Sequence, residues 1–168
     1  RYWLKQLKPG GRLYLLEPGT KEAAHSIQML RDQLGKDFNI LGPCTHQQPC
    51  PMNERPQDWC HFTLRTQAGP LAKRIAELAQ RRYQETHFSW LVIENGPAKE
   101  TKRHQHRILD VRRNDKNALR VLTCSEAGHS QLTAPKRARQ VYEQAKKLQA
   151  GDLLRLELNG LELKGDGY

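Results

Sequence analysis

The sequence predicts an α/β fold that continues into a small antiparallel β unit with one helix. In the first half, helical patterns alternate with apolar strand-like runs, separated by turns that contain Gly and Pro. From about residue 99 onward, short strand-like segments follow one another through turns, with one basic helical segment among them. We therefore expect two domains, residues 1–98 and 99–168, with a cysteine-rich insertion at residues 39–60.

The first domain opens with a helical pattern that Pro9-Gly10-Gly11 ends. Residues 12–17 form an apolar run closed by Pro18, which predicts a buried strand. Thr20 is a suitable N-cap for the next helix, because its side-chain oxygen can accept a hydrogen bond from a free backbone N–H. The apolar residues of that helix recur on one face: Ala23, Ile27, Leu30 and Leu34.

The insertion at 39–60 has neither a helix-like nor a strand-like period, and regular structure is predicted again after it. Residues 60–65 predict a short strand and residues 87–95 a long one. Between them Pro70 suits the first turn of a helix, where its missing N–H costs nothing. One face of this helix carries Leu71, Ile75 and Leu78.

The second domain is predicted to be mainly β-structure. We expect a hairpin of two strands, at residues 103–113 and 118–124, followed by a further strand at 129–134. A helix is then expected at 135–151 and a final hairpin at 152–165. The last of these turns at Asn159-Gly160, a pair favoured in tight hairpin turns.

The composition is that of a globular protein rich in positive charge. Hydrophobic residues make up 37% and charged residues 27% of the 168, and the formal net charge is +10. This surplus attracts polyanions, above all nucleic acid, and a merely solvated basic surface is the alternative. A membrane partner is not expected, because no basic helix carries a broad apolar face. Since the first residue is Arg1, we expect a fragment of a longer protein.

Cys44, Cys50 and Cys60 lie in the insertion, and Cys124 lies in the second domain. Unrelated buried thiols would more often lie inside apolar strands or helices than in a loop rich in proline. Disulfides would require an oxidising compartment, and the sequence carries no signal-peptide pattern. Thiolate ligands fit better, because prolines reduce the entropy that the loop loses when it wraps around a metal.

The spacing Cys-x₅-Cys-x₉-Cys differs from the C-x₂-C of common zinc ribbons. It suits an object wider than one ion, such as a [4Fe–4S] cluster held by four thiolates. Spacing alone leaves zinc as an equal alternative. In a zinc site, His46 and His61 could replace cysteines, because imidazole is a good zinc ligand.

Several motifs together resemble one known family. They are "LKPGGRLYLLEPGT", "PCTHQQPCP", "WCHF", "FSWLVIEN" and "LTCSEAGHSQLTAPKRARQVYEQAKKLQAGD", and they extend through nearly the whole chain. The most specific are the cysteine series and the late cysteine before a basic helix. The sequence is similar to the methyltransferase-like protein family associated with the small ribosomal subunit, found in mitochondria and in bacteria.

The resemblance implies that the first domain is the later half of a class I methyltransferase-like Rossmann sheet. It also implies that a [4Fe–4S] cluster is held by Cys44, Cys50, Cys60 and Cys124. The implied partner is the rRNA of the small ribosomal subunit, with ribosomal proteins as further partners, during assembly or translation. The implied compartment is the bacterial cytoplasm or the mitochondrial matrix.

The sequence contains no glycine-rich loop preceded by a strand, the element that cradles a nucleotide cofactor in such folds. We therefore assign no catalytic residue and expect S-adenosylmethionine to bind only in the full-length protein. Two other functions stay open: an active S-adenosylmethionine-dependent rRNA methyltransferase, and a zinc-dependent RNA-binding module.

Two basic segments, around residues 99–120 and 136–147, predict contacts with RNA. Arginine suits phosphate because its planar guanidinium donates two parallel hydrogen bonds. Only Tyr142 is an aromatic residue near these segments, so we expect recognition of the RNA backbone and shape rather than of bases. The predicted RNA-binding residues are Lys102, Arg103, Arg112, Arg113, Lys136, Arg137 and Arg139.

Overall fold

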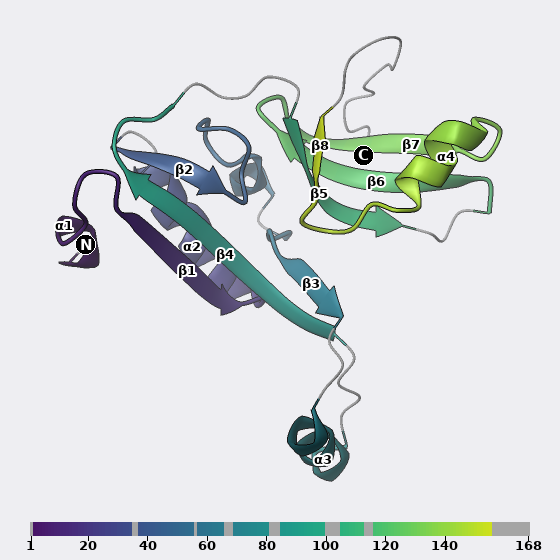
Figure 1. Ribbon diagram of the computed structural model, residues 1–168, viewed down its shortest axis with the longest axis horizontal. Helices are drawn as coiled ribbons and strands as arrows, with labels where there is room; N and C mark the ends of the chain where they lie inside the picture. Colours follow the sequence, from purple (N-terminus) through teal and green to yellow (C-terminus); the bar gives the residue numbers. More distant parts are fainter. Residues whose placement is uncertain are drawn as a thin grey trace.

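The computed structural model describes residues 2–34, 37–55, 57–65, 69–80, 85–99, 105–112 and 116–155. Its described strands form two four-stranded sheets, and every described pair of neighbouring strands is antiparallel. Figure 1 shows the two sheets, with helix α2 against the N-terminal one and helix α4 against the C-terminal one. The mixed α/β class is confirmed, whereas a Rossmann-type parallel sheet is not.

The N-terminal sheet is built around its longest strand, β4 (Glu85–Asn95), with the order β1-β4-β2 and with β3 also paired to β4. The other strands are β1 (Arg12–Pro18), β2 (Phe38–Gly42) and β3 (Phe62–Arg65). Because β1 and β2 are both antiparallel to β4, they point in the same direction. Helix α2 (Lys21–Leu34) connects them and covers one face of the sheet.

Helix α2 begins as the sequence predicts. The backbone N–H of Ala23 donates to Thr20 Oγ1 at 3.4 Å, so the predicted N-cap is confirmed. The apolar face of the helix packs mainly on β4 and β1, and the buried core there consists of Ile27, Leu34, Ile40, Leu91 and Ile93.

Strand β1 is exposed on one side, which contradicts the prediction of a buried strand. Leu13 and Leu15 pack against the core, whereas Tyr14 is 68% and Leu16 is 71% exposed. The reason is that α2 covers only one face of the sheet, and successive strand residues point to opposite faces.

The remaining N-terminal elements are short. Helix α1 spans Tyr2–Lys5, α3 spans Pro70–Leu78, and a 3₁₀-helix, η1, spans Pro51–Glu54. Both β2 and η1 lie within or at the edge of the insertion, which is thus more regular than the sequence predicts. The predicted apolar face of α3 is exposed, and Figure 1 shows this helix standing apart from both sheets.

The C-terminal sheet has the order β7-β6-β5-β8. Its strands are β5 (Gln105–Arg112), β6 (Ala118–Ser125), β7 (Gly128–Pro135) and β8 (Leu153–Arg155). The predicted hairpin of β5 and β6 and the further strand β7 are confirmed. Of the predicted final hairpin, only β8 lies among the described residues.

Helix α4 (Arg139–Ala145) is shorter than the predicted 135–151. Strand β7 extends through Pro135, which delays the start of the helix, and the helix ends at Ala145, before Gly151, whose φ is +96°. Helix α4 packs on one face of the sheet, where the buried core consists of Ile108, Leu119, Val121, Ala134 and Ala145.

Direct hydrogen bonds join the loop after β2 to the C-terminal sheet. Thr45 Oγ1 donates to the carbonyl oxygen of Gln105 at 2.9 Å, and Arg107 Nε donates to that of Pro43 at 2.6 Å. The same guanidinium lies 5.8 Å from the ring centre of Trp90 on β4. These contacts hold the two sheets together; the division into domains at residue 98 stays a prediction.

Among the described helices, none has the length and apolar character needed to cross a lipid bilayer.

Candidate functional site

The four cysteines lie near one another, although three belong to the N-terminal part and one to the C-terminal sheet. Cys44 and Cys50 lie in the loop between β2 and η1, Cys60 lies two residues before β3, and Cys124 is on β6. Cys50 and Cys124 are buried, Cys44 and Cys60 are half-buried, and all four are free thiols. Each thiol is near enough to the other three for charge on one to affect the pKa of another.

Burial keeps these thiols protonated. Removal from water raises the pKa of Cys50 to about 11 and that of Cys124 to about 12. It raises the pKa of Cys60 well above the ordinary value, and the neighbouring thiols raise it further. Burial also raises the pKa of Cys44, against the opposing effect of the Arg31 and Arg107 charges. Positive charge placed near the sulfur atoms would favour their ionised form.

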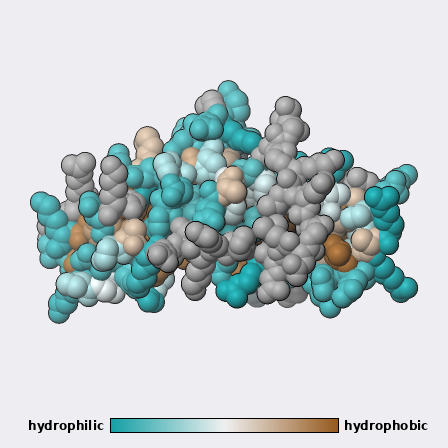
Figure 2. Space-filling view, turned by 90° about the horizontal axis from the view of Figure 1, so that it is seen from above, coloured by the Kyte–Doolittle hydropathy of each residue, from teal (hydrophilic) through white to brown (hydrophobic). Residues whose placement is uncertain are grey.

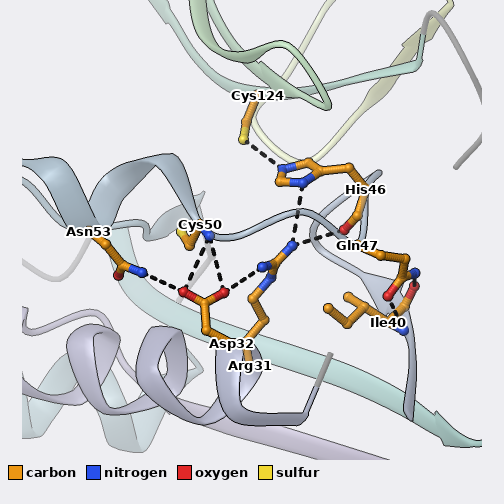
Figure 3. Close-up of polar contacts among 8 residues, drawn as sticks. All are labelled: Arg31, Asp32, Ile40, His46, Gln47, Cys50, Asn53 and Cys124. Atoms are coloured by element: carbon orange, nitrogen blue, oxygen red, sulfur yellow. Dashed lines mark hydrogen bonds and ion pairs between the residues drawn. The ribbon is translucent and has the colours of Figure 1, made fainter. Parts of the chain in front are cut away.

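Arg31 and Asp32, at the end of α2, hold the cysteine loop in shape (Figure 3). The Arg31 side chain is 2% exposed and pairs with Asp32 at 2.5 Å. Its Nη2 donates to the carbonyl oxygen of His46 at 2.9 Å. Asp32 in turn accepts the backbone N–H of Cys50 at 3.1 Å and a hydrogen bond from the Asn53 amide. One ion pair thus fixes both ends of the segment 46–53.

His46 connects this network to the C-terminal sheet. The ring is buried, and burial together with the Arg31 charge lowers its pKa to about 4, so it is neutral near pH 7. A guanidinium can only donate, so the contact from Arg31 Nη2 at 3.4 Å makes His46 Nδ1 an acceptor. The ring proton is then on Nε2, which lies 3.7 Å from Cys124 Sγ and donates to it.

Gln47 fastens the start of the loop to β2. Its Oε1 accepts the backbone N–H of Ile40 at 3.1 Å, and its Nε2 donates to the Ile40 carbonyl oxygen at 3.0 Å. The side-chain amide therefore continues the sheet hydrogen bonding at a point where the backbone leaves the sheet.

A cavity of about 30 Å³ lies between the cysteine loop and α2. Cys44, Cys50 and Cys60 line it, together with Gln28 and Arg31. Within the described part of the chain, Gln28 Nε2 and Arg31 Nε are buried and have no hydrogen-bond partner. Buried unpaired donors are costly, and an acceptor beside the sulfur atoms would satisfy both.

The donors are not arranged around a single ion. Among the described residues, no group of three or more His, Cys, Asp or Glu side chains could hold one metal ion. His46 and His61, considered above as zinc ligands, have other contacts. His46 Nδ1 is bound by Arg31, and the His61 ring stacks on Trp59 at 5.5 Å.

The predicted RNA-binding residues that the structure describes lie toward the other end of the C-terminal sheet from Cys124. Arg112 is opposite Arg120 at that end, and Lys136 bonds through its backbone N–H to Asn117. Lys136, Arg137 and Arg139 are exposed where β7 leads into α4. Figure 2 shows that the described surface seen from above is largely hydrophilic. Lys102, Arg103 and Arg113 lie outside the described residues.

Arg31, Asp32 and Gln28 were not predicted as part of the site. On sequence alone they are ordinary polar residues of an amphipathic helix. Their position in the sequence could have indicated that they are buried. Gln28 and Arg31 follow Ala24 and Ile27 at the spacing of one buried helical face.

A comparison with curated protein sequences finds no significant match. A family model described as "Mitochondrial small ribosomal subunit Rsm22" matches residues 2–155. This range includes both described sheets, all four cysteines and the whole Arg31–His46 network. The chain therefore belongs to the mitochondrial small ribosomal subunit Rsm22 family.

Proposed function

We propose that this chain is part of a methyltransferase-like protein that binds the rRNA of the small ribosomal subunit, in assembly or translation, and carries a [4Fe–4S] cluster. The observation that supports the proposal is that four buried or half-buried thiols, three from the N-terminal part and one from β6, lie near two buried donors that lack hydrogen-bond partners among the described residues. Membership of a small-subunit family supports the ribosomal partner. The compartment is the one in which small subunits act, the mitochondrial matrix or the bacterial cytoplasm.

The connectivity of the N-terminal sheet supports a methyltransferase-like origin. Strands β1 and β2 run in the same direction and are joined by α2, as in a strand–helix–strand unit of an α/β protein. Strand β4 is inserted between them in the opposite direction. The proposed function does not include methyl transfer, since fold alone does not establish it.

The chemistry of the four thiols matches what a cluster would need. Cys44, Cys50, Cys60 and Cys124 would supply the four thiolates that a [4Fe–4S] cluster requires. Gln28 Nε2 and Arg31 Nε would donate to the anionic group, and the charges of Arg31 and Arg107 would offset part of its negative charge.

When bound, the cluster supplies a rigid covalent connection between the loop and β6. The chain's own residues prepare that connection. Asp32 holds the Cys50 backbone, Arg31 orients the His46 ring, and His46 directs its Nε2–H at Cys124 Sγ. Hydrogen bonds of this kind to ligand sulfur atoms stabilise the ligand and influence the reduction potential of the centre.

The RNA part of the proposal predicts a steep salt dependence. If the basic surface contacts about five phosphates, the logarithm of the affinity for small-subunit rRNA should fall against the logarithm of salt concentration with a slope of roughly −3 to −5. Reversing the charge of Arg112, Lys136, Arg137 and Arg139 together to Glu should flatten this slope by about three units, because four phosphate contacts are lost.

The control is the reversal of Lys73 and Arg74 on α3, which should leave the slope unchanged. Circular dichroism should show that both variants are folded. Cosedimentation with purified small subunits should then measure the binding of each variant. A folded quadruple variant with the wild-type slope would assign these four residues to a merely solvated surface.

A further inference from the structure

A large cleft lies between the two sheets, outside the cavity that the thiols line. Its volume is about 860 Å³, within the range of roughly 300–1,000 Å³ common for ligand sites. Described residues between Met52 and Thr63 line one wall, and residues of β5, β6 and β7 line the other. Cys60 belongs to both the cleft and the thiol cavity, so the cleft reaches the proposed cluster site.

The first wall presents two aromatic rings that are held in place. The rings of Trp59 and His61 stack with 5.5 Å between centres and 29° between planes. Trp59 Nε1 donates to the carbonyl oxygen of Gly19 at 2.9 Å, and His61 Nδ1 donates to that of Trp59 at 3.1 Å. Rings that are already fixed lose little entropy when a further flat group stacks on them.

The second wall is the face of the C-terminal sheet that α4 leaves uncovered. The α4-facing core contains Leu119 and Val121, so the intervening residues of β6, Arg120 and Leu122, point toward the cleft side. Arg112 lies opposite Arg120 in the register. It is paired with Asp110 at 3.4 Å, and both side chains are about half exposed, so the pair contributes little. Arg112 can therefore bind a phosphate group.

The acidic residues of the cleft narrow the class of ligand. Asp58 and Asp110 line it together with Arg55 and Arg112, so positive charge does not dominate, and a small free anion would gain little. Carboxylates accept hydrogen bonds from the amino groups of bases and from ribose hydroxyl groups. Stacked rings, arginines and carboxylates together suit a group that is flat, hydrogen-bonding and phosphorylated.

We propose that this cleft holds an unpaired ribonucleotide of the RNA that the protein binds, with its base against Trp59 and His61 and its phosphate near Arg112. The inference rests on the proposed RNA-binding function and deepens it. It also revises the expectation of backbone recognition alone. That expectation considered only aromatic residues near the basic segments, whereas Trp59 reaches the cleft from the N-terminal part.

The test compares two RNAs of the same sequence, one single-stranded and one in a duplex, in binding to anaerobically purified protein. Trp59→Ala and His61→Ala should each weaken binding of the single strand by about tenfold, because stacking of a base on an aromatic ring contributes this order of affinity. Duplex binding should change less than twofold. Tyr14→Ala is the matched control, since Tyr14 is an exposed aromatic residue outside the cleft.

A crosslinking measurement on the wild-type chain tests the proposal even if the variants do not fold. A single strand that carries one photoreactive 4-thiouridine should crosslink to the peptide containing Trp59 or to the cleft residues of β5. If Trp59→Ala binds the single strand like the wild type, or the crosslinks fall only on α4, the cleft proposal is overturned while RNA binding stands. If the wild type binds neither RNA, the proposed function itself fails.

Discussion

Anaerobically purified Cys124→Ser protein is expected to lack the broad absorbance of a [4Fe–4S] cluster near about 400 nm. Proteases should also cut it between β4 and β5 much faster than they cut the wild type. Cys124 is the proposed ligand from the C-terminal sheet, whereas the other three come from the N-terminal part. Without it, hydrogen bonds such as those of Thr45 and Arg107 would still join the sheets, but the proposed cluster would no longer connect them.

Two further variants give this prediction its controls. Cys44→Ser should also bleach the absorbance but should mainly loosen the proline-rich loop, so cleavage between the sheets should rise less. Ala134→Ser places the same hydroxyl in a buried position of the same sheet, away from the thiols, and should stay coloured. A coloured and protease-resistant Cys124→Ser protein would contradict the assignment of this residue.

Arg31→Met is expected to lower the free energy of unfolding by about 3 kcal/mol, because removal of one partner leaves the other charge of a largely buried pair uncompensated. The variant loses the pair with Asp32 and both hydrogen bonds to His46, so the cysteine loop loses its fixed shape. Urea denaturation followed by tryptophan fluorescence should show a lower midpoint.

Arg74→Met on α3 is the matched control. Arg74 pairs with Glu77 at 3.5 Å, and both side chains are at least two-thirds exposed, so its replacement should cost less than about 1 kcal/mol. If both variants unfold at the same urea concentration, the Arg31 network has no special role in stability.

The sequence predicts local structure well where one physical signal dominates. Thr20 has the right chemistry and position for an N-cap, and the apolar alternation of β4 and β6 is strong enough to locate both strands. The length of α4 is predicted poorly, because Lys136 and Arg137 are compatible with a helix but lie in the turn after β7. Helix propensity is weak compared with strand pairing at that point.

Features that depend on contacts between distant parts of the chain are harder to predict from the sequence. The convergence of Cys124 with Cys60 joins positions 64 residues apart in the sequence, so spacing suggests a shared site but no geometry. Arg31 resembles a solvent-facing helix residue until β2 and the loop are placed beside it. Likewise, Trp59 becomes part of a cleft only when the C-terminal sheet supplies the opposite wall.

Quantifying iron, acid-labile sulfide and zinc in anaerobically purified wild-type protein tests the central claim most directly. If the four thiols hold a [4Fe–4S] cluster, the protein should contain about four iron atoms and about four sulfides per chain. One zinc per chain without sulfide would contradict the cluster and retain the shared thiol site. A stable, folded protein free of metal, in which all four thiols react independently with an alkylating reagent, would contradict both.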